Sequence, residues 1–92
     1  MREIDIQSAI REYLEGMGWL VILNTQPRQQ GARKGRADLT CIGPKGKFME
    51  VEVKTAKGML SEDQKAYAAN LHLRGHTYIV ARSVADVMDG MK

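Results

Sequence analysis

The stretch Gly35–Leu60, GRADLTCIGPKGKFMEVEVKTAKGML, decides the fold because it contains two apolar runs joined by turn residues. The first run, Asp38–Ile42, opens with an aspartate, and the second, Phe48–Lys54, follows a cluster of glycine and proline. Two short runs separated by such a cluster are typical of a β-hairpin. The stretch therefore predicts two antiparallel strands at the centre of the fold.

The second run has one apolar face and one polar face, because side chains alternate along a strand. Glu50, Glu52 and Lys54 share the polar face. A five-residue loop, residues 43–47, would place Asp38 opposite Glu52 on that face. A four-residue loop would shift the pairing by one residue and separate them. We adopt the first pairing, through the longer loop or a bulge, because it brings two carboxylates together.

Two carboxylates beside a lysine can hold a hard divalent cation and position a water molecule. Oxygen ligands favour Mg²⁺ or Mn²⁺ over Zn²⁺. Such an ion lowers the pKa of its bound water and stabilises charge on a phosphoryl oxygen, as phosphodiester hydrolysis requires. A half-solvated strand also commonly alternates apolar residues with glutamate and lysine. The triplet Glu52–Lys54 therefore needs support from the rest of the chain.

Four segments together make the chain resemble the VRR-NUC domain family of the PD-(D/E)xK nuclease superfamily. The segments, which span nearly the whole chain, are Gly35–Asp38, Glu52–Lys54, Leu60–Gln64 ahead of Tyr67, and Glu3 with Ile6–Gln7. The resemblance implies a restriction-endonuclease-like α/β fold of order αβββαβα, with helices flanking a mixed central sheet. One departure is Ala37, which stands where the superfamily name has proline.

The resemblance also implies roles for the residues of the hairpin. Asp38 and Glu52 are expected to ligate the metal together with the backbone carbonyl of Val53. Lys54 is expected to be catalytic, by orienting the attacking water or stabilising negative charge. The implied cofactor is Mg²⁺ or Mn²⁺, and the implied activity is hydrolysis of DNA.

Two predicted helices carry the remaining site residues that the resemblance implies, Glu3 and Gln64. Apolar residues at spacings of three and four predict a helix over Glu3–Gly16, with Glu3 near its buried stripe. Glu12, which lies away from that stripe, is the alternative to Glu3. A second helix begins after Ser61, and Gln64 three residues later fits a capping box. Gln64 also lies on the stripe that faces the sheet, where a buried amide needs a partner.

Positive charge is concentrated in one segment just before Asp38. The chain has a formal net charge of +3, and residues 24–36 contain four basic residues and no acid. Beside a metal site such a loop would attract a polyanion, because neutralising phosphates supplies most sequence-independent affinity for DNA. The alternative is a loop that is merely solvated. The predicted DNA-binding residues are Arg28, Arg33, Lys34, Arg36 and Lys57.

The remaining segments predict two more strands and a last helix. Trp19–Leu23 and His76–Ala81 are predicted strands. The second of these should be parallel to its neighbour, because a strand, helix and strand form a right-handed crossover. Ser83 begins a short helix whose apolar stripe covers either the chain's own sheet or a second copy. That stripe consists of Val84, Val87, Met88 and Met91.

Length and composition bound the organisation of the protein. Its 92 residues predict one small domain over residues 1–92. The single cysteine, Cys41, excludes a disulfide within the chain and fits a reducing compartment. No apolar run approaches the roughly 20 residues that span a membrane, and the N-terminus lacks the apolar core of a signal peptide. We therefore expect a cytoplasmic protein with no membrane partner.

Our first hypothesis is a metal-dependent endonuclease acting on DNA, and the resemblance suggests branched DNA such as a four-way junction. Resolving a junction requires two symmetric cuts, so a homodimer is expected. One alternative is a DNA-binding or assembly module of the same fold that has lost its chemistry. Others are a flap-cutting or nicking nuclease, and a restriction-type enzyme, for which the chain has little surface for reading bases.

Overall fold

The computed structural model describes residues 2–24 and 35–92. The elements in chain order are α1 (Glu3–Gly16), β1 (Leu20–Leu23), β2 (Leu39–Ile42), the short 3₁₀ helix η1 (Pro44–Gly46), β3 (Phe48–Val53), α2 (Glu62–Leu73), β4 (Thr77–Ala81) and α3 (Val84–Gly90). Apart from η1 inside the hairpin loop, this is the predicted αβββαβα order.

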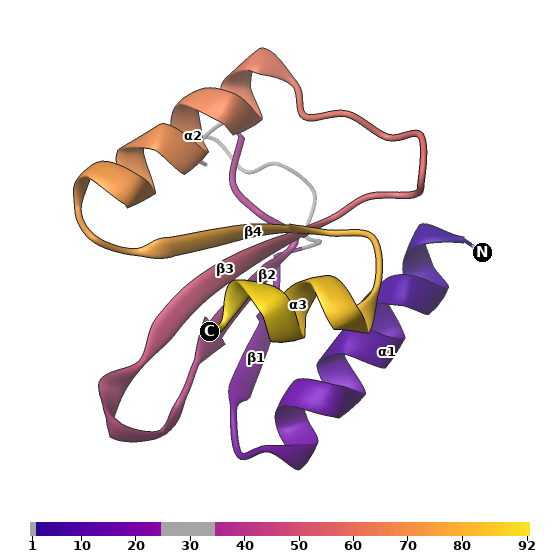
Figure 1. Ribbon diagram of the computed structural model, residues 1–92, viewed down its shortest axis with the longest axis vertical. Coiled ribbons are helices and arrows are strands. Elements are labelled where there is room, and N and C mark those ends of the chain that lie inside the picture. The colour runs from indigo at the N-terminus through magenta and orange to yellow at the C-terminus, as the bar shows by residue number, and fades with distance from the viewer. Residues whose placement is uncertain (1, 25–34) are drawn as a thin grey trace.

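The strands form one mixed sheet with the order β1-β2-β3-β4. The pairs β1–β2 and β2–β3 are antiparallel, and β3–β4 is parallel, as the crossover through α2 predicts. Figure 1 shows α1 and α3 on one side of the sheet and α2 on the other. The predicted fold class, a mixed sheet flanked by helices, is confirmed.

The hairpin has the five-residue loop that brings the two acids together. Ile42 is paired with Phe48, and the Gly43 N–H donates to the carbonyl of residue 47 at 2.8 Å. The same register, continued by one residue beyond β2, places Asp38 opposite Glu52. The adopted pairing is confirmed, and β2 and β3 pair without a bulge.

The core lies between the sheet and the layer formed by α1 and α3. Helix α1 contributes its stripe of Ile6, Ile10 and Leu14, as its spacing predicted. The facing side chains of the sheet are Val21, Leu39, Cys41, Met49, Val51, Val53, Ile79 and Ala81. Each large apolar side chain that is fully buried contributes about 1.5–3 kcal/mol by leaving water. Burial raises the pKa of the Cys41 thiol to about 12, so Cys41 is a neutral core residue.

The apolar stripe of α3 covers the chain's own sheet. Val87 is fully buried, and Val84 and Met91 pack against the core. Met88 is 42% exposed. Of the two uses that the sequence left open for this stripe, the structure shows the first, so α3 does not present a free apolar face for a second copy.

Two predicted strands begin one residue later than expected, for the same reason. The Trp19 N–H donates to the carbonyl of Leu14 at 3.0 Å, and the His76 N–H donates to the carbonyl of Leu71 at 2.9 Å. Both residues therefore close the end of the preceding helix, where carbonyl groups lack partners within the helix. Strands β1 and β4 accordingly begin at Leu20 and Thr77.

In the part of the chain that the structure describes, none of the helices has the length and apolar character needed to span a membrane.

Candidate active site

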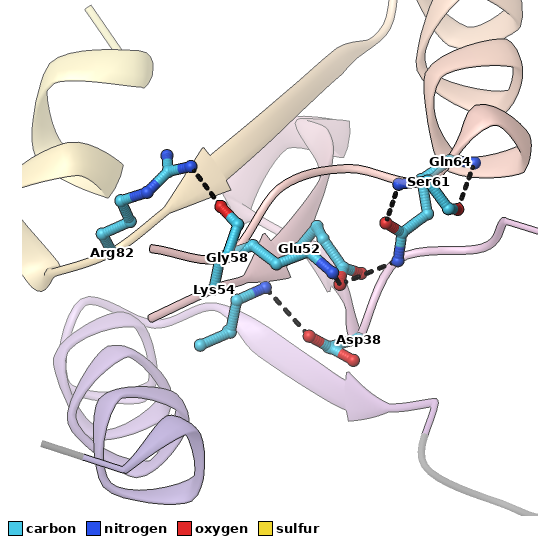
Figure 2. Close-up of polar contacts among 8 residues, drawn as sticks. Asp38, Glu52, Lys54, Gly58, Ser61, Gln64 and Arg82 are labelled. Atoms are coloured by element: carbon cyan, nitrogen blue, oxygen red, sulfur yellow. Dashed lines mark hydrogen bonds and ion pairs between the residues drawn. The ribbon is translucent and has the colours of Figure 1, made fainter. Parts of the chain in front are cut away.

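Four of the residues predicted to carry the chemistry, Asp38, Glu52, Lys54 and Gln64, meet where β2 begins and β3 ends (Figure 2). Asp38 Oδ2 accepts a hydrogen bond from the backbone N–H of Val53 at 2.9 Å. Glu52 Oε2 accepts from Gln64 Nε2 at 3.0 Å and forms an ion pair with Lys54 Nζ at 3.2 Å. The structure thus brings two acids, a lysine and an amide into one cluster, which we call the acid–lysine site.

Negative charge in this site is only partly compensated. Glu52 is 3% exposed, and burial raises the pKa of its carboxyl. The charge of Asp38 raises that pKa further, whereas the hydrogen bond and the charge of Lys54, together with the Asp38 backbone N–H, lower it. A positively charged ligand between Asp38 and Glu52 would relieve their mutual repulsion.

In each acid, one carboxylate oxygen accepts a hydrogen bond and the other has no partner among the described residues. Glu52 Oε1 is buried and has no hydrogen-bond partner among the described residues. Asp38 Oδ1 likewise has no partner there, since the N–H of Val53 binds Oδ2. Two unpaired carboxylate oxygens are hard ligands that suit Mg²⁺ or Mn²⁺. The donor set therefore fits the ion that the resemblance implies.

The acid–lysine site is not a complete cage. Among residues 2–24 and 35–92, no three or more side chains of His, Cys, Asp and Glu are arranged to hold a metal ion. Mg²⁺ is commonly bound by one or two carboxylates, with water and substrate phosphate as the remaining ligands. The open arrangement therefore fits an ion that is shared with a phosphate.

Gln64 performs two tasks that the sequence presented as alternatives. Its side-chain Oε1 accepts a hydrogen bond from the backbone N–H of Ser61 at 2.9 Å. The backbone N–H of Gln64 donates to Ser61 Oγ at 3.2 Å, which completes the capping box. Its Nε2 donates to Glu52. The amide thus joins the first turn of α2 to β3, as Figure 2 shows.

Gly35 explains why α2 begins beside the acids. It is buried with φ +81°, and an added Cβ would overlap the carbonyl of Asp63 and lie 2.8 Å from the nitrogen of Gln64. Glycine adopts this left-handed conformation without a steric penalty and also allows the close approach. Gly35 therefore lets the segment before β2 pack directly on the first turn of α2.

Lys54 is supported by a contact that the sequence did not predict. An added Cβ at Gly58 would lie 3.3 Å from the Cβ and Cδ atoms of Lys54, so this glycine packs closely on the lysine stem. Arg82 Nη2 donates to the Gly58 carbonyl at 2.7 Å (Figure 2). The hydrogen bond between Arg82 and Gly58 is long-range, and no spacing in the sequence indicates it.

The structure leaves Glu3 and Glu12 apart from the acid–lysine site. Glu3 is exposed in the first turn of α1, and its carboxylate has no hydrogen bond or ion pair with the described residues. Figure 1 shows the N-terminal end of α1 at the end of the sheet where β3 ends. Glu12, also exposed, is about two and a half turns further along the helix. Glu3 is therefore nearer than Glu12 to the end of the sheet that carries Asp38 and Glu52, but it does not contact these acids.

The predicted DNA-binding residues fall into two groups. Arg28, Arg33 and Lys34 lie outside the described residues. Lys57 is exposed in the loop after β3. Arg36 is also exposed, but it contacts a second polar cluster formed by Asn24, Thr40 and Glu50. Strand alternation could have indicated part of this cluster, because the same register pairs Thr40 with Glu50 on the face that carries Asp38 and Glu52.

Comparison with known proteins identifies the family. The sequence model of the VRR-NUC domain matches residues 5–85. The chain belongs to the VRR-NUC domain family. A solved structure described as a VRR_NUC domain is 28% identical, with a TM-score of 0.80 over 97% of this chain and 92% of the other. A search of curated proteins gave no match.

VRR-NUC domains are a nuclease-type family, which implies DNA as the substrate. The predicted family and its fold are therefore confirmed for this chain. The roles of Asp38, Glu52, Lys54 and Gln64 remain predictions, which their geometry supports.

Proposed function

We propose that this VRR-NUC domain is a Mg²⁺- or Mn²⁺-dependent endonuclease that hydrolyses phosphodiester bonds in DNA. The observation that carries the proposal is the pair of opposed acids Asp38 and Glu52, of which Glu52 has a buried oxygen without a hydrogen-bond partner among the described residues. The ion pair between Lys54 and Glu52 supports it further. A sheet that needed only solubility on this face would not bury an acid beside another acid.

Asp38, Glu52 and the backbone carbonyl of Val53 would hold the metal ion. When bound, such an ion withdraws charge from a phosphoryl oxygen and lowers the pKa of a coordinated water. The unpaired oxygen of Glu52 and the repulsion between the two acids support this assignment. The same observations do not distinguish Mg²⁺ from Mn²⁺, since both prefer oxygen ligands.

The remaining residues of the site would orient the reacting groups. Lys54 Nζ lies against Glu52 Oε2 and carries a positive charge that can orient the attacking water or stabilise negative charge on the phosphate. Gln64 and the N–H of Val53 hold one oxygen of each acid, which fixes the direction of the other oxygen. This preorganisation is what a hydrolytic site needs before the substrate arrives. Glu3, at the same end of the sheet, would complete the site once substrate is bound.

We further propose branched DNA, such as a four-way junction, as the substrate and a homodimer as the active form. Two symmetric cuts need two sites related by a two-fold axis. The sheet face that α2 covers only in part offers an interface, because Leu20, Ile22 and Ile42 on it are 59%, 41% and 41% exposed. Strand β1 is also an edge of the described sheet, and an edge strand has free backbone groups.

A monomeric nuclease that nicks DNA or cuts flaps is the second candidate. The observation in its favour is that α3, the helix predicted to offer a dimer interface, packs on the chain's own core. A DNA-binding module without chemistry is a third candidate. The buried acids argue against it, because binding to DNA requires only the basic residues.

One experiment separates these candidates. The protein is incubated with linear, flapped, forked and four-way DNA in Mg²⁺, in Mn²⁺ and in EDTA, beside the variant Asp38→Asn as control. The proposal expects cleavage of the four-way junction in either metal, and none in EDTA or by the variant. Cleavage of flaps alone would favour the monomeric nuclease. Binding without cleavage in both metals would contradict nuclease activity.

A further inference from the structure

A second polar cluster lies beside the acid–lysine site on the same face of the sheet. Thr40 and Glu50 are paired across β2 and β3, and they are only 5% and 1% exposed. Arg36 reaches them from the segment before β2, and Asn24 from the end of β1. The proposed metal binding and chemistry use neither Thr40 nor Glu50.

The hydrogen bonds of this cluster have a fixed direction. The Thr40 hydroxyl oxygen accepts from Asn24 Nδ2 at 2.8 Å and from Arg36 Nη2 at 3.1 Å. Both nitrogens can only donate, so they occupy both acceptor positions of the hydroxyl. The hydroxyl proton then points at Glu50 Oε2, 2.5 Å away. Glu50 Oε2 also forms an ion pair with Arg36 Nε at 3.7 Å.

The Arg36 guanidinium is held on one side and open on the other. Its Nε and Nη2 atoms face Glu50 and Thr40, while its side chain is 49% exposed. A guanidinium has five N–H groups, so both donors of Nη1 and one of Nη2 remain for another ligand. Such a planar set of donors matches the oxygens of a phosphate. Only one residue separates Arg36 from Asp38, so a phosphate bound there would lie close to the acid–lysine site.

A purely structural role does not explain Glu50. Burying a carboxylate is unfavourable, and one ion pair with a half-exposed arginine recovers only part of its lost hydration. Its second oxygen, Oε1, is buried with no hydrogen-bond partner among the described residues. An apolar pair in place of Thr40 and Glu50 would fix the same register without that cost. The cluster is better explained by its effect on Arg36.

We propose that Glu50 is a positioning residue that, directly and through Thr40, holds the Arg36 guanidinium as a fixed binding group for a phosphate of the DNA backbone. The inference rests on the proposed function, because it takes DNA as the ligand. A side chain that is already fixed loses less conformational freedom on binding than a mobile one. Glu50 would thereby increase affinity for DNA although it is itself negatively charged.

The sign of one substitution tests this role. Glu50→Gln removes a negative charge, so affinity for DNA should rise if Glu50 acts only through its charge. If Glu50 positions Arg36, affinity should fall by about three- to tenfold. The measurement is the fluorescence anisotropy of labelled DNA, titrated in EDTA so that no cleavage occurs. Glu15→Gln, which removes an exposed acid on α1, is the matched control and should not lower the affinity.

A double-substitution cycle identifies Arg36 as the residue through which Glu50 acts. Arg36→Gln alone should weaken binding and reduce the slope of log K against log salt concentration by about one. In the Arg36→Gln background there is no arginine for Glu50 to position, so adding Glu50→Gln should not lower the affinity for DNA any further. An equal loss in both backgrounds, or no loss from Glu50→Gln in the wild-type background, would overturn the proposal.

Thr40 provides a second route if Glu50→Gln does not fold. Thr40→Val removes the hydroxyl that joins Glu50 to Arg36, whereas Thr40→Ser keeps it. The proposal expects weaker binding from Thr40→Val and wild-type binding from Thr40→Ser, and equal affinities would contradict it. A wild-type protein that does not bind DNA at low salt would refute the proposed function. Wild-type binding with no response to these variants would refute only the role of Glu50.

Discussion

Glu52 is buried with two donors on one of its oxygens. Lys54 Nζ and Gln64 Nε2 both contact Oε2, while Oε1 has no partner among the described residues. Strand alternation predicted that Glu52 and Lys54 share a face, because that period depends only on the local backbone. It could not predict that Gln64 contacts the same oxygen as Lys54, since this depends on where α2 packs. Strand alternation likewise placed Glu50 on the polar face but could not predict its burial, which the structure shows.

Lys54→Met should lower the cleavage rate at saturating DNA by about 10²- to 10³-fold, the range expected when one group that stabilises developing negative charge is lost. The methionine stem can still pack on Gly58, so the fold should remain. Lys65→Met is the matched control, because Lys65 is exposed on α2 and, among the described residues, forms an ion pair only with Glu62. Single-turnover assays in Mn²⁺ check both variants. A wild-type rate in Lys54→Met would show that its proposed role is wrong.

At the scale of elements, the hairpin was predictable in detail and the docking of α2 was not. The loop composition and the two acids together predicted the pairing of Ile42 with Phe48, which the structure confirms. The capping box at Ser61 also followed from local spacing. By contrast, no local pattern predicted that Gly35 contacts the first turn of α2, because that contact is tertiary.

Gly35→Ala should lower the melting temperature more than Gly46→Ala. Both glycines have positive φ, +81° and +77°, so alanine costs about 1–2 kcal/mol in left-handed strain at either position. Only at Gly35 would the added methyl group overlap the backbone of α2, since there is open space around Gly46. In a domain of this size each further 1 kcal/mol lowers the melting temperature by about 4–8 °C. Scanning calorimetry measures the difference.

Cleavage provides a second comparison of these two variants. Gly35→Ala should also reduce the cleavage rate, because moving the first turn of α2 moves Gln64 away from Glu52. Gly46→Ala should cleave DNA at the wild-type rate, since the hairpin loop lies at the other end of β3. Equal melting temperatures and equal rates would mean that Gly35 does not fix α2 at the site.

At the scale of the whole molecule, the two faces of the sheet are covered unequally. Helices α1 and α3 bury one face, whereas α2 has no fully buried residue and leaves part of the other face exposed. The sequence could not decide between the two uses of the α3 stripe, because an apolar stripe looks the same whether its own sheet or a second copy covers it. The structure buries the α3 stripe and leaves Leu20, Ile22 and Ile42 exposed, so the proposed dimer would use these three residues.

Ile22→Lys should therefore convert a homodimer into a monomer, because a charged side chain would have to be buried at the interface. Leu73→Lys is the matched control, since Leu73 is 83% exposed at the end of α2. Sedimentation velocity at micromolar concentration, with and without four-way DNA, measures the mass. A wild-type protein that sediments as one chain under both conditions would exclude the dimer and favour nicking or flap cutting.

Glu52 is the residue on which the proposed metal binding depends most directly, and single-turnover cleavage of saturating DNA by Glu52→Gln in Mn²⁺ tests this role. Glutamine keeps the shape of the side chain but removes the charge that would hold the ion. A metal ion contributes several kcal/mol of charge stabilisation, and about 1.4 kcal/mol is tenfold in rate, so we predict a loss of at least about 100-fold. Affinity for DNA in EDTA should be retained, and Glu62→Gln on the exposed face of α2 should cleave normally. Cleavage by Glu52→Gln at the wild-type rate would show that Glu52 does not hold a catalytic metal ion.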